Sequence, residues 1–194
     1  MKEIALHLLD ISENSVAAQA SNISITVCED LANDRLKASV KDDGKGMDAE
    51  MVKQVADPFF TSRTTRKVGL GIPLFKEAAE ACNGSLCILS APGKGTTLEV
   101  DFQRSHIDRM PLGDLSGTIL TLVVANPQVH WIFRYEIILP DGTLGSAYEF
   151  DDRPIKEELL DISLSEPDVL AFLRGAIEEG ITEVRDCYQE KEPF

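Results

Sequence analysis

Hydrophobic positions in the first part of the chain change their spacing several times, and each spacing predicts a different element. Over residues 2–20 they recur every three to four positions, as on one face of a helix. Over residues 22–28 and again over 36–42 they alternate with polar residues, which is typical of strands with one buried face. We expect the intervening Asp30–Asp34 segment to close a hairpin between these two strands.

Two helices and two strands are predicted next. A short helix follows Asp48, and a second covers residues 71–82, where an asparagine–glycine pair supplies a stop signal. Strands over 86–89 and 97–102 surround a turn rich in glycine. The predicted order is α-β-β-α-α-β-β. Because hairpins join antiparallel neighbours, we expect an α+β fold, an α/β sandwich of a mixed sheet with helices on one face.

The pattern changes after residue 104. It predicts a buried helix over residues 115–124, then a hairpin around a Pro-Asp-Gly turn, then two helices. The ranges expected for the hairpin strands and the last helices are 129–139, 143–150, 154–161 and 167–190. We therefore expect one domain over residues 1–104 and a small acidic α+β unit over residues 105–194.

Charge is unevenly distributed between these two parts. Residues 1–104 carry 12 Lys/Arg and 15 Asp/Glu, a net of −3, whereas residues 105–194 carry 7 and 18, a net of −11. An acidic surface repels nucleic acid and anionic lipid, so we expect neither as a partner. The acidic half is either a solvated surface that aids solubility or a docking face for a basic protein.

Location is also suggested by the sequence. No apolar run reaches the roughly 18–20 residues of a membrane span, and no basic segment leads into an apolar one near the start. The four cysteines form no Cys-x-x-Cys pair. We expect a reduced, cytoplasmic protein.

Polar side chains interrupt the apolar face of the first helix. Asp10 and Asn14 are four residues apart and share one side of it, with His7 nearby. Mg²⁺ takes few protein oxygens and leaves the rest of its coordination to water and phosphate. Asn14 suits such a metal position, and Asp10 suits the orientation or deprotonation of a water. The alternative for such a pair is a solvated helix edge.

Glycine-rich turns follow two of the predicted elements. Asp42 ends a strand and is followed by Gly44 and Gly46, where glycine permits positive φ and a close approach to a ligand. A carboxylate there can accept a hydrogen bond from the amino group of adenine. Gly69-Leu70-Gly71 opens a helix whose first N–H groups suit phosphate oxygens. The basic residues just before it suit a lid over the outer phosphates.

Together these motifs resemble the GHKL ATPases, which include DNA gyrase, MutL, heat-shock chaperones and histidine kinases. The resemblance covers residues 1–104 and implies the Bergerat fold, with ATP between helices and sheet. It also implies that Asn14 binds Mg²⁺ and that Asp42 reads adenine. Gly93, Gly95, Thr96 and Thr97 match the last glycine motif of the family, whose threonine supports that aspartate. The residues that we expect around Mg-ATP are Asp10, Asn14, Asp42, Gly44, Gly46, Met47, Thr61, Arg63, Lys67, Gly69, Leu70, Gly71 and Thr97.

Three departures from the histidine kinases affect the expected activity. We expect no helical phosphoacceptor unit before the first helix, and only eight residues separate Phe60 from Gly69 in the lid. Asp10 stands where gyrase-like ATPases have a glutamate base. The whole chain also resembles stand-alone ATP-binding proteins that are often encoded near iron hydrogenase genes.

The sequence thus predicts a cytoplasmic protein that binds Mg-ATP. One expected activity is phosphoryl transfer from ATP to a protein partner, or slow ATP hydrolysis, in which positioning and charge neutralisation do most of the catalysis. The alternative is a non-catalytic, ATP-dependent switch that docks a protein partner through its acidic half.

Overall fold

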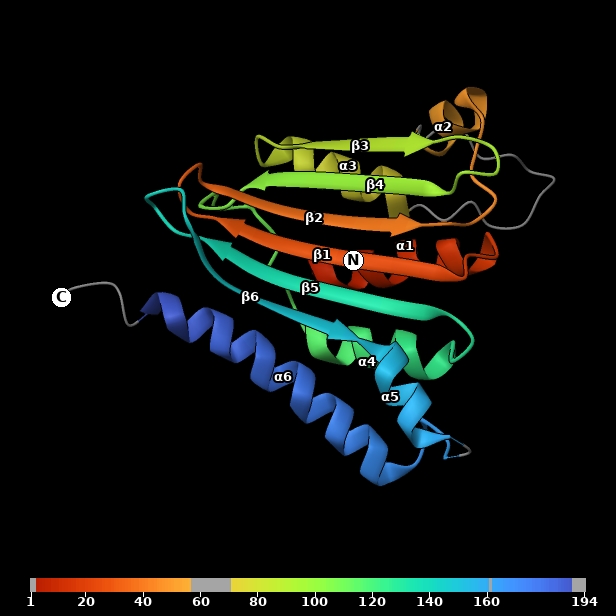
Figure 1. Ribbon diagram of the computed structural model, residues 1–194. Coiled ribbons are helices and arrows are strands. Elements are labelled where there is room, and N and C mark those ends of the chain that lie inside the picture. Colours follow the sequence, from red (N-terminus) through yellow and green to blue (C-terminus); the bar gives the residue numbers. More distant parts are fainter. Residues whose placement is uncertain (1–2, 57–70, 161, 190–194) are drawn as a thin grey trace.

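A six-stranded sheet with helices packed on one face forms the body of the computed structural model, which describes residues 3–56, 71–160 and 162–189 (Figure 1). The strand order is β3-β4-β2-β1-β5-β6. The strands are β1 (Asn22–Asp30), β2 (Arg35–Asp42), β3 (Ser85–Ser90), β4 (Thr96–Gln103), β5 (His130–Ile138) and β6 (Leu144–Asp151). The helices are α1 (Ile4–Ala17), α2 (Ala49–Val55), α3 (Gly71–Ala81), α4 (Leu115–Ala125), α5 (Asp152–Leu159) and α6 (Pro167–Gln189).

The sheet is mixed, as the sequence predicted. β1–β2, β2–β4, β3–β4 and β5–β6 are antiparallel pairs, whereas β1 and β5 run parallel. The hairpin expected at Asp30–Asp34 joins β1 to β2. The described elements of the first part follow the predicted order α-β-β-α-α-β-β.

Alternation along the strands separates a covered face from an open one. In β1, Ile23, Ile25 and Val27 are buried, while Ser24 and Thr26 between them are more accessible. Figure 1 shows α1, α3 and α4 behind the sheet, and α6 runs along β6 and contacts α4. The helices therefore cover the apolar face, which confirms the expected placement of helices on one side.

Residues 105–194 complete this sheet instead of forming a second one. β5 pairs with β1 over its whole length, from Asn22 opposite His130 to Asp30 opposite Ile138. Without β5, β1 would be an edge strand with unpaired backbone groups. The boundary predicted after residue 104 lies between β4 and α4, and the hydrophobic core continues across it.

Element ends agree with the sequence to within a few residues, and α5 shows why one of them shifts. It begins at Asp152, two residues before the predicted start, because Asp151 caps it by accepting a hydrogen bond from the Arg153 amide at 2.9 Å. Pro154 is tolerated in the first turn, where no intrahelical N–H bond is needed. Among the described residues, no helix has both the length and the apolar character that a membrane crossing requires.

Candidate functional site

A cavity of about 230 Å³ lies between α1, α2 and the ends of β2 and β4. Most of its wall is apolar, and a few polar side chains reach it, which is the usual make-up of a small-molecule site. The apolar lining includes Ile11, Val40, Met47, Met51, Val55, Ile72, Ile88 and Leu98. The polar lining includes Asn14, Ser15, Asp42, Lys45 and Thr96.

Asp42 is the carboxylate of this cavity, and it is only 8% exposed. Its Oδ2 accepts a hydrogen bond from the Ser15 hydroxyl at 2.7 Å. Its Oδ1 accepts from the amides of Gly44 at 2.9 Å and Thr96 at 3.2 Å. A carboxylate offers about four acceptor positions, so one on Oδ2 is left for a donor in the cavity. The three protein donors also fix the direction in which that position points.

Two glycines let the loops around Asp42 pack closely. Gly46 has φ +65° and Gly95 has φ +79°. A side chain at Gly46 would overlap the Ala91 carbonyl, and one at Gly95 would overlap the carbonyl of Asp42. Glycine is therefore required at both positions by conformation and by space.

Ser90 ties these loops together. Its hydroxyl accepts a hydrogen bond from the Met47 amide at 2.8 Å and donates to the Gly95 carbonyl at 2.9 Å. It also lies 2.9 Å from the Thr96 hydroxyl. The loop after β2 and the turn before β4 are thus joined beside the cavity, where Met47 and Gly46 line the wall.

In the last glycine motif, the Thr96 amide contacts Asp42. The Thr96 amide reaches the Asp42 carboxylate, and Thr96 lines the cavity together with Leu98. Side chains alternate along a strand, so Thr97 points toward the open face of the sheet. The structure thus brings Thr96 to Asp42 through its backbone amide, and the role that the resemblance implies for a threonine of this motif stays a prediction.

Asp10 and Asn14 share the side of α1 that leads from the cavity toward α3. Asn14 lines the cavity and is exposed. Asp10 Oδ2 is buried, has no hydrogen-bond partner among the described residues, and occupies the space that a side chain at Gly71 would fill. A buried carboxylate oxygen without a partner is costly, so this position fits a cation or water that arrives with a ligand.

His7 lies one turn before Asp10 and is buried in the contact between α1 and α3. Its ring stacks on Phe75. Burial lowers the pKa of His7 to about 4, although the nearby Gly71 backbone acts in the opposite direction. The ring is therefore neutral near pH 7.

The predicted lid lies outside the described residues. Thr61, Arg63, Lys67, Gly69 and Leu70 all belong to this segment. Gly71, the last residue of the second glycine motif, is described and opens α3.

Sequence reasoning missed Ser15 as a site residue. It continues the helical spacing of Ile4, Leu8 and Ile11 on the buried face of α1, and it is itself buried. A hydroxyl at such a position needs a partner. Its place in an apolar stripe was the signal that could have pointed to the bond with Asp42.

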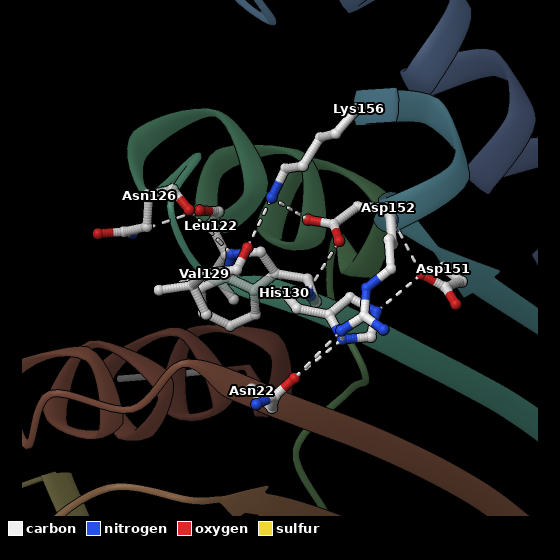
Figure 2. Close-up of polar contacts among 10 residues, drawn as sticks. Asn22, Leu122, Asn126, Val129, His130, Asp151, Asp152 and Lys156 are labelled. Atoms are coloured by element: carbon white, nitrogen blue, oxygen red, sulfur yellow. Dashed lines mark hydrogen bonds and ion pairs between the residues drawn. The ribbon is translucent and has the colours of Figure 1, made fainter. Parts of the chain in front are cut away.

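A second polar cluster joins the starts of β1 and β5 to the junction of β6 and α5 (Figure 2). Asn22 donates to Asp43 Oδ2 at 2.6 Å, and its Oδ1 lies 3.1 Å from His130 Nδ1. His130 Nε2 lies 2.8 Å from Asp151 Oδ1. The cluster holds the start of β5 beside the start of β1, close to Asp42.

The same cluster brings a histidine and two carboxylates within the reach of one metal ion: His130, Asp151 and Asp152. Asp152, however, already pairs with Lys156 at 2.5 Å and accepts from the Trp131 amide at 3.0 Å (Figure 2). These partners occupy the ligand atoms that a metal would need. We therefore assign the cluster a structural role.

The family is identified by comparison. Residues 2–106, more than half of the chain, match the family of histidine kinase-, DNA gyrase B- and HSP90-like ATPases. The chain belongs to this family. The match, together with the mixed sheet and its helices on one face, confirms the Bergerat-type α+β fold.

Individual relatives are sensor kinases. ZraS of Klebsiella oxytoca, a sensor histidine kinase, is 36% identical over 89 residues, which cover 45% of this chain and 19% of ZraS. YxdK of Bacillus subtilis (strain 168), another sensor histidine kinase, is 36% identical over 73 residues, covering 36% and 22%. The match thus spans only about a fifth of the length of each relative.

One solved structure also aligns with this chain. The Aquifex aeolicus MutL ATPase domain complexed with ADP aligns with a TM-score of 0.49 at 15% identity. The alignment covers 82% of this chain and 68% of that one.

Proposed function

We propose that this protein binds Mg-ATP in the cavity around Asp42. The observation that carries the proposal is a buried carboxylate with one acceptor position left, at the polar end of an apolar slot. A flat heteroaromatic ring with an exocyclic amino group fits that arrangement, and adenine is such a ring. Membership of the ATPase family supports the assignment.

Other residues would serve the metal and the phosphates. Asn14 would hold Mg²⁺, and the orphaned oxygen of Asp10 would accept a hydrogen bond from a water near it. Mg²⁺, when bound, neutralises phosphate charge. Gly71, at the start of α3, would present its backbone to the phosphates. We further propose that Gly69 and Leu70, together with Thr61, Arg63 and Lys67, close over the outer phosphates.

Calorimetric titration with Mg-ATP tests the binding proposal. We expect Asp42→Asn to weaken binding by about tenfold or more, the scale of one hydrogen bond to a charged group. Glu99→Gln is the matched control, because it removes one negative charge from the exposed face of β4. No heat with the unaltered protein, or equal affinity in the Asp42→Asn variant, would contradict the proposal.

We propose that bound ATP then reacts, by phosphoryl transfer to a protein partner or by slow hydrolysis. The unpaired Asp10 oxygen supports a reaction, because it lies where it can orient a nucleophile. Incubation with γ-labelled ATP separates the outcomes: label on a partner supports transfer, and free phosphate supports hydrolysis. An unchanged hydrolysis rate in Asp10→Ala would remove Asp10 from this role.

A non-catalytic switch is the second candidate, and the acidic half of the chain favours it. α6 exposes Glu179, Glu183 and Asp186, three acidic residues within two helical turns. A basic protein partner in the cytoplasm would complement this surface. Pull-down with and without ATP tests the switch: ATP-dependent capture of a basic protein, weakened by salt and leaving ATP intact, supports it, and capture that ignores ATP contradicts it.

A further inference from the structure

An aromatic stack joins α1 to α3. The rings of His7 and Phe75 are 4.4 Å apart between centroids and only 10° from parallel. Both side chains are buried, with His7 2% and Phe75 0% exposed. His7 precedes Asp10 by one turn of α1, and Phe75 follows Gly71 by one turn of α3. The stack therefore lies one turn away from the point where Asp10 meets Gly71.

The contact between Asp10 and Gly71 is tight. Asp10 Oδ2 occupies the space of a side chain at Gly71, so the carboxylate rests directly against the α3 backbone. A small shift of α3 along or away from α1 would open this contact. The first turn of α3 carries the N–H groups proposed for the phosphates, so the same shift would misdirect them.

We infer that His7 is a positioning residue for the phosphate side of the site, acting with Phe75 to hold the first turn of α3 against Asp10. This inference rests on the proposed binding of Mg-ATP. Asp42 lines the cavity, whereas neither ring of the stack does. Ile72 reaches the cavity wall from the first turn of α3, but its apolar side chain offers the base no hydrogen bond. His7 should thus affect the phosphates and spare adenine.

The chemistry of the ring fits this role. A neutral imidazole has one N–H donor and one bare acceptor. Nδ1 has no hydrogen-bond partner among the described residues, and the Gly71 backbone lies close enough to the ring to favour its protonated form. Stacking fixes the ring plane, and the polar contact fixes Gly71 relative to α1. A neutral ring also adds no positive charge beside Asp10, which keeps that carboxylate available to a bound cation.

Ordinary core packing predicts a different result from positioning. If His7 only fills space, its replacement lowers stability and weakens all ligands alike. If it positions α3, replacement weakens ligands that carry phosphates and leaves adenosine unchanged. The ratio of the affinities for Mg-ATP and adenosine separates the two roles.

The test uses the full chain and three variants. His7→Leu removes the ring and the polar contact, and His7→Phe keeps a ring for the stack but loses the contact with Gly71. Cys82→Ala is the control, because Cys82 is buried just past the end of α3, far along the helix from Gly71. Calorimetry with adenosine and with Mg-ATP is done where unfolding curves show every variant to be folded.

We expect His7→Leu to lose about tenfold or more in affinity for Mg-ATP. One misdirected N–H of α3 would lose its hydrogen bond to a charged phosphate, and a bond of that kind is on this scale. Its affinity for adenosine should stay within about twofold, His7→Phe should lose less, and Cys82→Ala should keep the ratio of the unaltered protein. Equal weakening of both ligands, an unchanged ratio in His7→Leu, or the same change of ratio in Cys82→Ala would overturn the inference. Failure of the unaltered protein to bind either ligand would instead refute the proposed function.

Discussion

Replacing Ser15 with alanine removes one of the three hydrogen bonds that hold the Asp42 carboxylate. The Ser15 hydroxyl donates to Asp42 Oδ2 over 2.7 Å, and both residues are buried, at 5% and 8% exposed. A hydrogen bond to a charged group contributes about 1.5–3 kcal/mol. We expect the free energy of unfolding to fall by about this amount.

Ser12→Ala is a matched control on the same helix. Ser12 is 0% exposed, and its hydroxyl has no hydrogen-bond partner in the described part of the chain. Both substitutions delete one buried oxygen from α1. Because Ser12 loses no bond and a buried unpaired hydroxyl is unfavourable, its removal should be neutral or stabilising.

Thermal unfolding curves of the three proteins measure the difference. In a chain of this length 1 kcal/mol shifts the Tm by about 2–4 °C, so Ser15→Ala should melt about 3–12 °C lower. The Ser12→Ala protein should melt at or above the temperature of the unaltered protein. Equal destabilisation by the two substitutions would refute the claim that Ser15 acts through its bond to the carboxylate.

Three further predictions concern stability. Gly93 and Gly95 both have positive φ, but only Gly95 has no room for a methyl group. Chemical denaturation should show that the free energy of unfolding falls by about 1–2 kcal/mol in Gly93→Ala and by about 3 kcal/mol or more in Gly95→Ala. Similar losses in the two variants would contradict this prediction. Lys156→Met leaves the buried Asp152 carboxylate without its cation, so the Tm should reflect a loss of about 3–5 kcal/mol, which a second change, Asp152→Asn, should partly restore. Burial lowers the pKa of His7 to about 4, so as the pH falls the unfolded chain binds a proton before the folded one does. Stability therefore decreases as the pH drops from about 6.5 toward 4. Between pH 7 and pH 5 the free energy of unfolding of the unaltered protein should fall by about 2 kcal/mol more than that of His7→Leu.

Local patterns in the sequence predicted the elements well. The three-to-four spacing in α1 and the alternation in β1 and β2 follow directly from which side chains face the core. Gly46 and Gly95 were recognisable because few other residues accept their backbone conformation. Each of these features is set by residues that are close together in the sequence, so the sequence alone is enough to predict it.

Contacts between distant segments were less accessible. The parallel pairing of β5 with β1 joins residues about a hundred positions apart, and nothing in either strand specifies its neighbour. Two threonines follow Gly95, and only the register of β4 against β2 decides which backbone amide reaches Asp42. Ser15 was visible as a polar residue in an apolar stripe, but its partner became clear only when β2 was placed beside α1.

Adenine recognition by Asp42 is the central claim, and a comparison of two ligands tests it without altering the protein. Inosine triphosphate carries a carbonyl where ATP carries the amino group, so it would place an acceptor against the carboxylate. Calorimetry with both magnesium complexes should show inosine triphosphate binding weaker by about tenfold or more. Equal affinity for the two nucleotides would contradict the account.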